Sequence, residues 1–176
     1  MSWEEMIAVA MVVKQRMMEL DVENLWPHHL PNVAADEDDL ARVEQTIGRP
    51  LDPKYKEFLR YADGWSGFYQ SVDLFGTRDL IGSPRMDRAR TLLASVDKKV
   101  IETSGCDTPN LLPIAVSSED IDLFVLVGNS TVGEVVWFAG GEIDRFPDFV
   151  EFFLAMVDYN REDVADLMKE IDGTSS

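Results

Sequence analysis

Apolar positions spaced three and four residues apart predict two short helices in the first third of the chain. The first begins after Asp36, whose carboxylate can accept hydrogen bonds from the free amides of the first turn, and ends at Gly48. The second begins at Pro53, because proline suits the first helical position, and ends at Gly64. We expect the two helices to bury Leu40, Val43, Ile47, Tyr55, Phe58, Leu59 and Ala62.

Longer apolar runs, bounded by turn-forming residues, predict strands in the second half of the chain. The links between these runs are too short for the crossover that parallel strands need, so neighbouring strands should be antiparallel. The expected strands are 111–116, 123–127 and 134–139, after which Gly140-Gly141 turns the chain toward 142–146. The segments 72–75 and 78–81 are expected to form short strands or an edge turn around Gly76.

Helical spacing returns at both ends of the chain. The segment 3–19 contains the run IAVAMVV, which is apolar all round, so the helix should be buried on more than one side. It either packs on the domain's own core or forms a self-association surface that makes a homodimer. Further helices are expected at 84–103, from Pro147 onward and at 161–171. The pattern predicts an α+β fold, with N-terminal and C-terminal helices packed on a mostly antiparallel sheet of four to six strands.

Two stretches carry a family resemblance. IGRPLDPKYKEFLRYADGW (47–65) resembles the opening signature of the SUKH superfamily, and 111–157 resembles its strand meander and final helix. The resemblance covers about residues 25–160. It implies one SUKH-like domain over 1–176, in which 1–34 is an N-terminal helix and connector, 35–160 the family-like core, and 161–176 an acidic helix and tail.

The same resemblance implies a function. SUKH proteins include many bacterial immunity proteins, so we expect a non-catalytic domain that neutralises a toxin domain by direct binding. The alternative is a regulatory or scaffold module that binds several cellular partners, like a yeast regulator of cell-wall synthesis in this superfamily.

Charge narrows the choice of partner. The net charge is −17, and residues 101–176 carry 3 basic against 16 acidic residues. Direct nucleic-acid binding is disfavoured, because its affinity depends on neutralising phosphates. A basic protein partner, such as a nuclease toxin, is favoured because complementary fields speed association. The alternative is that the acidic charge only keeps the protein soluble.

No residue set points to catalysis, a metal or a cofactor. His28 and His29 are the only histidines, and adjacent side chains usually point apart. Cys106 is the only cysteine, so no intrachain disulfide can form and a reducing, cytoplasmic location fits. The apolar run 6–13 is short and preceded by acids, so we expect neither a signal peptide nor a membrane span.

The expected partner-binding residues fall into two groups. Three aromatic residues lie among glycines after the second helix, where a loop could present them as interface anchors, although Trp65 could instead anchor the core. Acidic residues of the strand meander would face a basic cleft. The candidate residues are Trp65, Phe68, Tyr69, Glu119, Asp120, Asp122 and Glu134.

Overall fold

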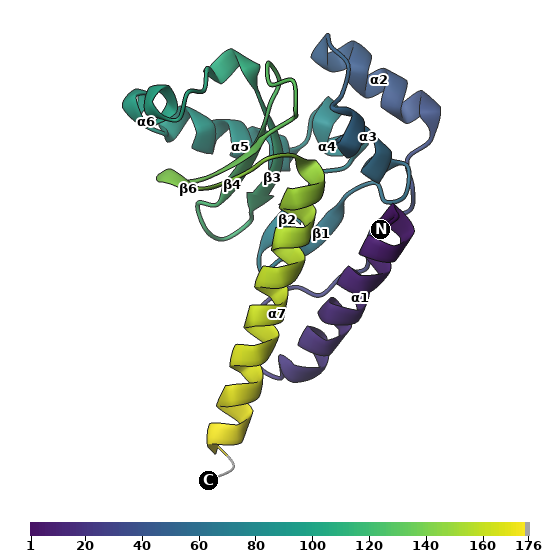
Figure 1. Cartoon of the computed structure of the whole chain (residues 1–176), viewed down its shortest axis with the longest axis vertical. Coiled ribbons are helices and arrows are strands. Elements are labelled where there is room, and N and C mark those ends of the chain that lie inside the picture. Colours follow the sequence, from purple (N-terminus) through teal and green to yellow (C-terminus); the bar gives the residue numbers. More distant parts are fainter. Residues whose placement is uncertain (175–176) are drawn as a thin grey trace.

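An antiparallel sheet with helices on both faces forms the body of the protein (Figure 1). The computed structural model describes residues 1–174, and within them the sheet has six strands in the order β1-β2-β3-β4-β5-β6. Every strand pairs antiparallel with its sequence neighbour, which confirms the predicted α+β class. The strands are β1 Trp65–Tyr69, β2 Val72–Leu74, β3 Leu111–Ser117, β4 Leu123–Val127, β5 Val135–Ala139 and β6 Gly141–Phe146.

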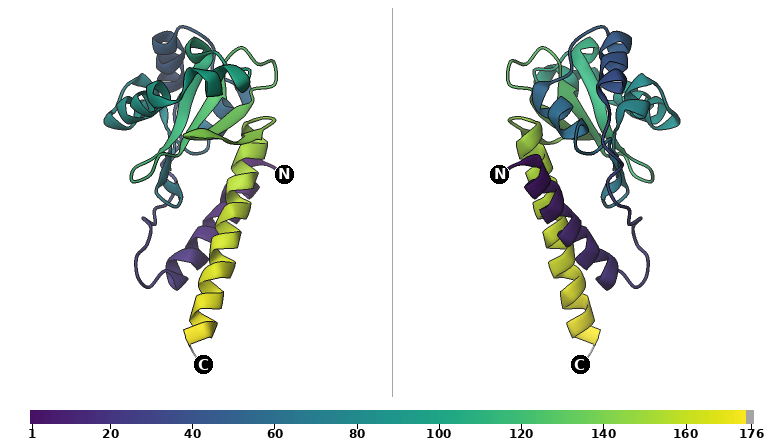
Figure 2. Two further views of the ribbon diagram at one scale, coloured as in Figure 1. Left: turned by 90° about the vertical axis from the view of Figure 1, so that its left-hand side faces the viewer. Right: turned by 90° about the vertical axis from the view of Figure 1, so that its right-hand side faces the viewer.

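The helices lie in sequence before, between and after these strands, and α5 packs on β3 while α7 packs on β1 (Figures 1 and 2). Successive residues of β4 point to opposite faces, so Phe124 contacts Phe152 of α7 while Leu123 points toward α5. The helices are α1 Trp3–Leu20, α2 Glu37–Ile47, α3 Pro53–Leu59, α4 Thr77–Ile81, α5 Pro84–Ser95, α6 Lys98–Thr103 and α7 Phe149–Thr174; a 3-10 turn spans Thr108–Asn110.

Both predicted start signals of the early helices are confirmed, and so is the predicted stop at Gly48. The Asp36 carboxylate accepts a hydrogen bond from the Asp39 amide at 2.7 Å, and Gly48 ends α2 in the left-handed region at φ +73°. The Asp52 carboxylate accepts from the first amides of α3. This helix ends at Leu59, one turn before the predicted Gly64.

Two predictions between β2 and β3 are wrong. The expected strand 78–81 is the helix α4, because the distant carboxylate of Asp63 accepts from both the amide (2.5 Å) and the hydroxyl (2.7 Å) of Thr77 and so caps its first turn. The expected single helix 84–103 is broken after Ser95. There Val96 is extended and Asp97 caps α6 by accepting from the Lys99 amide.

The two helices expected near the C-terminus are one helix, α7, which begins at Phe149 rather than at Pro147. Asn160 lies where the break was predicted. Its side-chain amide donates to the carbonyl of Phe68 in β1 (3.0 Å) and to that of Met156 one turn back (2.9 Å). This buried residue therefore continues the helix and ties it to the sheet.

Aromatic rings hold α1, α3 and α7 together. Neighbouring ring centroids are 4.8 to 6.5 Å apart, in mostly tilted and edge-on arrangements that suit ring quadrupoles. These largely buried rings belong to Trp3, Tyr55, Phe58, Phe149 and Phe153.

The helix α1 lies along α7 and extends with it beyond the sheet (Figures 1 and 2). One face of α1 therefore packs on the domain's own core, which was the first of the two alternatives given for the segment 3–19. Lys14 is 5% exposed on this face, and its Nζ has no hydrogen-bond partner among residues 1–174. Burial lowers the pKa of Lys14 to about 8, although the carboxylates of Asp163 and Asp21 partly offset this shift.

Gly64→Ala should destabilise the fold by at least about 2 kcal/mol, since Gly64 has φ +84° and an added Cβ would lie 2.6 Å from the Gly76 nitrogen. Gly48→Ala is the matched control, because Gly48 has φ +73° with open space around it. Denaturant unfolding should give a clearly larger loss for Gly64→Ala. Equal losses of unfolding free energy in the two variants would show that the close approach of the Gly64 and Gly76 backbones does not add to the cost of the substitution.

Lys14→Met should stabilise the protein at pH 7 by up to about 3 kcal/mol, because the folded state disfavours the charged ammonium. The lowered pKa means that the wild-type penalty is fully present below pH 8 and disappears as the pH rises to 10.5. The stability difference between variant and wild type should therefore shrink between pH 7 and pH 10. A variant less stable at pH 7 would show that the ammonium stabilises the α1–α7 contact.

Candidate functional site

Trp65 and Phe68 lie in the core, with exposures of 0% and 1%. The prediction of an exposed recognition loop is wrong, because 65–69 forms the strand β1, whereas the alternative that Trp65 anchors the core is confirmed. Gly67 has φ +61° and the pairing register with β2 shifts there, so this irregularity lets both aromatic side chains face inward, with centroids 5.5 Å apart. The indole nitrogen of Trp65 donates to the His29 carbonyl at 2.8 Å.

Tyr69, the third predicted aromatic, is partly exposed and forms a cluster with two residues that sequence reasoning missed. Its ring centroid is 6.4 Å from that of Trp137 in β5 and 5.7 Å from that of Tyr159 in α7. Trp137 and Tyr159 are 5.7 Å apart and meet edge-on. Trp137 is itself only 9% exposed and stacks on the buried Phe124, so the core holds the cluster in place and the partly exposed rings of Tyr69 and Tyr159 form its outer part.

Two half-buried carboxylates lie beside this cluster. Asp122 accepts a hydrogen bond from the Trp137 indole nitrogen at 2.9 Å, and Asp163 accepts one from Gln70 at 3.1 Å. Burial raises the pKa of both carboxyl groups above the ordinary value. The pKa of the Tyr69 hydroxyl is also raised, first by burial and then by the negative charges of Asp163 and Asp122.

We call the resulting patch the aromatic–acidic surface. It joins side chains from β1, from the start of β4, from β5 and from the middle of α7. Its members are Tyr69, Asp122, Trp137, Tyr159 and Asp163.

Glu119 and Asp120 adjoin this surface in the turn that leads into Asp122. Their backbone amides donate to the Ser117 hydroxyl, and Arg88 donates to the carbonyl oxygens of Ser117 and Asp120. The turn is thus fixed through its backbone. The side chains of Glu119 and Asp120 are exposed and form no ion pair with any residue of 1–174.

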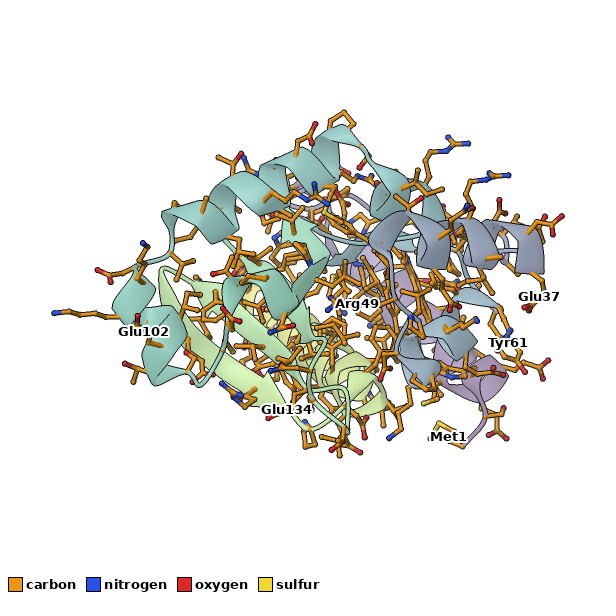
Figure 3. The ribbon with its side chains drawn as sticks, turned by 90° about the horizontal axis from the view of Figure 1, so that it is seen from above. Met1, Glu37, Arg49, Tyr61, Glu102 and Glu134 are labelled. Carbon is orange, nitrogen blue, oxygen red and sulfur yellow. The ribbon has the colours of Figure 1, made fainter. Side chains whose placement is uncertain are left out.

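Glu134 does not belong to this surface. It precedes β5, and the antiparallel register pairs Leu126 with Val135 but Leu123 with Phe138, so Glu134 lies at the opposite end of these strands from Asp122. Glu134 is also paired with Arg145 at 3.3 Å (Figure 3 labels Glu134). The prediction of one acidic face containing all four carboxylates is therefore wrong, because an antiparallel meander separates the two ends of a strand.

A separate depression of about 290 Å³ lies between the 47–53 segment and the loop after β4. Arg49, labelled in Figure 3, lies over Gly128, where a side chain would collide with its guanidinium. Ser130 and Thr131 also line this depression.

The surroundings of His28 and Cys106 disfavour the catalytic roles that were considered for them above. His28 Nε2 is 2.7 Å from the buried carboxylate of Asp21, and burial raises the pKa of the Cys106 thiol, which disfavours the reactive thiolate.

Within residues 1–174, no three His, Cys, Asp or Glu side chains are placed to hold a metal ion. No helix in the same range is long and apolar enough to cross a membrane.

Comparison with known families supports these structural observations. The model of the SMI1/KNR4 family (SUKH-1) matches residues 34–155, which run from α2 through the whole sheet into the first turns of α7. The chain belongs to the SMI1/KNR4 family. This membership supports a binding domain rather than an enzyme. No curated protein matches the chain closely enough to be reported as a relative.

The SMI1/KNR4 match divides the aromatic–acidic surface. Tyr69, Asp122 and Trp137 lie inside the matched residues, whereas Tyr159 and Asp163 lie beyond them on α7. The helix α1 also lies outside the match. The matched residues therefore include the whole sheet, whereas α1 and most of α7 lie outside them.

Trp137→Phe should raise the pKa of Asp122 further, since the half-buried carboxylate loses the indole donor that favours its charged form. The ring contacts with Phe124 and Tyr159 should largely remain. NMR titration of the side-chain carboxyl carbons measures this shift, and Asp148, whose carboxylate accepts from Lys54 rather than from an indole, is the internal control. An unchanged Asp122 titration would contradict the assigned hydrogen bond.

Proposed function

We propose that this SUKH-1 chain is an immunity protein that binds a basic toxin domain through the aromatic–acidic surface and carries out no chemical step. The observation that supports the proposal is the contact of Tyr69, Trp137 and Tyr159 with one another beside Asp122 and Asp163. Aromatic residues are enriched in the few contacts that dominate protein interfaces.

The physical chemistry of the surface favours a cation. Ring faces attract Lys and Arg through their quadrupoles, and carboxylates form strong charge-assisted hydrogen bonds with guanidinium groups. The raised pKa values of Asp122 and Asp163 show that the protein stabilises their charged forms less than water does. A partner cation would supply the missing stabilisation, so each pair would form with a smaller desolvation cost.

Acidic residues outside the aromatic–acidic surface also favour a basic partner. Glu119 and Asp120 have exposed carboxylates next to Asp122, and residues 101–176 carry 16 acidic side chains. Such a field speeds association with a basic domain, for example a nuclease that binds phosphate. The proposal places this encounter in the cytoplasm, where a chain with one cysteine needs no disulfide.

The proposal predicts a complex with the toxin domain encoded beside this gene, and protection of cells that co-express both. Asp122→Asn with Asp163→Asn should weaken this complex at least tenfold, because two charge-assisted contacts are lost while the side-chain shapes remain. The matched control removes two exposed charges elsewhere, by Glu102→Gln and Glu170→Gln, and should change the affinity less than twofold.

Calorimetry of the purified proteins measures these affinities, and circular dichroism checks that both variants fold. Equal weakening by the two pairs would mean that only net charge matters. Absence of a complex and of protection would overturn the immunity role, and weak binding to several unrelated proteins would support the scaffold alternative.

A further inference from the structure

The helix α1 has a second apolar stripe that α7 does not cover. The buried face of α1 contains Trp3, Ala10 and Met17. On the next face round the helix, Val12 is 68% exposed and Met18 is 53% exposed. Residues three and four apart share a helix face, and the stripe consists of Ala8, Met11, Val12, Gln15 and Met18.

The connector after α1 returns toward the sheet (Figure 2), and this stripe forms one wall of a groove of about 540 Å³. The other wall is formed by His28, His29 and Leu30, and the buried Trp65 also lines the groove. Leu30 is 71% exposed, so both walls present apolar surface to solvent. The groove is large enough for a small molecule, since ligand sites commonly enclose about 300 to 1,000 Å³.

The groove is preformed, because hydrogen bonds fix the connector that makes its second wall. The buried carboxylate of Asp21 accepts from the amides of Leu25 (2.8 Å) and Trp26 (3.2 Å) and contacts His28 Nε2. A ligand would therefore not have to order this wall, which lowers the cost of association. These contacts also mean that Asp21 is engaged within the connector.

Lys14 brings an ammonium group to this largely apolar lining. It follows Met11 by three residues and precedes Met18 by four, so it lies at the border between the stripe and the buried face of α1. Lys14 is 5% exposed, and its Nζ has no hydrogen-bond partner among residues 1–174. Burial lowers the pKa of Lys14 to about 8, because the carboxylates of Asp163 and Asp21 offset the loss of water only in part.

The Lys14 ammonium is costly to the fold unless it meets an anion. With a pKa of about 8 the group is still mostly protonated at pH 7, and a buried charge without a partner destabilises a protein. A second polar atom of the same lining, His28 Nδ1, is also buried without a partner in the described chain. The lining therefore combines apolar walls with a positive charge and unused hydrogen-bonding capacity.

These features select among occupants. A carboxylate would accept from Lys14 Nζ in a charge-assisted hydrogen bond, and an alkyl chain would cover the walls without adding polar groups. A peptide segment is disfavoured, because its backbone amides and carbonyls would meet few partners beside Ala8, Val12 and Leu30. A second copy is disfavoured by repulsion between chains that each carry a net charge of −17.

We propose that the groove between α1 and the 28–30 segment binds a fatty acid, with its carboxylate at Lys14 and its alkyl chain along the exposed stripe of α1. Both walls lie outside the SUKH-1 match, and the site is distinct from the aromatic–acidic surface. The proposal does not depend on the immunity role.

The test titrates decanoate into the full-length protein at pH 7 and follows binding by calorimetry. The dissociation constant should be below about 1 mM, and each methylene added from octanoate to dodecanoate should tighten binding about threefold, because more apolar surface is buried. Decylamine, which has the opposite charge on the same chain, should bind at least tenfold more weakly than decanoate. In NMR spectra the indole N–H of Trp65 should shift on binding while that of Trp137 stays in place.

Lys14→Met should weaken decanoate binding at least tenfold but change the binding of decanol less than twofold, because it removes the charge and keeps an apolar wall. The matched control Lys98→Met removes an exposed ammonium from α6 and should change neither affinity. Val12→Asn with Leu30→Asn should weaken both ligands at least threefold, since both exposed walls become polar. Circular dichroism checks that each variant folds.

Equal decanoate binding by wild type and Lys14→Met would show that the ammonium does not recognise the ligand and would overturn the proposal. So would equal binding of decanoate and decylamine, or no heat and no Trp65 shift at about 1 mM decanoate. A wild-type dimer that the Val12/Leu30 variant disperses in sedimentation would assign the groove to a second copy instead.

Discussion

The packing of a single long helix, α7, across one face of the sheet is the interaction on which the rest of the structure depends. Asn160 fixes its depth and rotation, because this buried side chain donates to the carbonyl of Phe68 in β1. Two turns before that bond α7 contacts the sheet through Phe152 and Phe153, and one turn after it the Asp163 carboxylate accepts from Gln70. The neighbouring Tyr159 meets Tyr69 and Trp137. Loss of this anchor would separate the two halves of the aromatic–acidic surface.

The same helix supports α1 and so creates the second surface. The aromatic contacts of Trp3 with Phe149 and Phe153 hold α1 on α7, which leaves the adjacent stripe of α1 facing the connector. The SUKH-1 core therefore supplies the sheet and half of one surface, whereas the terminal helices that extend beyond the family match supply the remainder.

The sequence predicts most of the fold, because its local signals agree with the final structure. The Asp36 and Asp52 caps and the three strands between 111 and 139 depend on neighbours in the chain and are confirmed. The errors arise where residues far away in the sequence determine the secondary structure. Asp63 caps α4 from outside the segment, and Asn160 continues α7 by bonding to a strand 92 residues earlier.

The candidate site could be predicted only in part, for the same reason. Tyr69 and Asp122 were identified from the sequence and do lie on one surface. Trp137 occurs in a run typical of a buried strand, and only the edge of its ring system and its hydrogen bond to Asp122 mark it as part of the site. Tyr159 and Asp163 are four residues apart, which places them on one helix face, yet nothing local indicates that this face meets Tyr69. Glu134, in contrast, was predicted as a site residue but lies elsewhere, because charge alone does not show which end of a strand a residue occupies.

Chemical-shift mapping of the complex with the neighbouring toxin domain tests the central claim most directly. The account predicts that the largest changes occur at the Trp137 indole N–H and at the backbone amides of Tyr69, Asp122 and Tyr159, while the loop beside Arg49 changes little. Changes confined to the depression between 47–53 and 128–133, with the Trp137 indole signal unmoved, would contradict it.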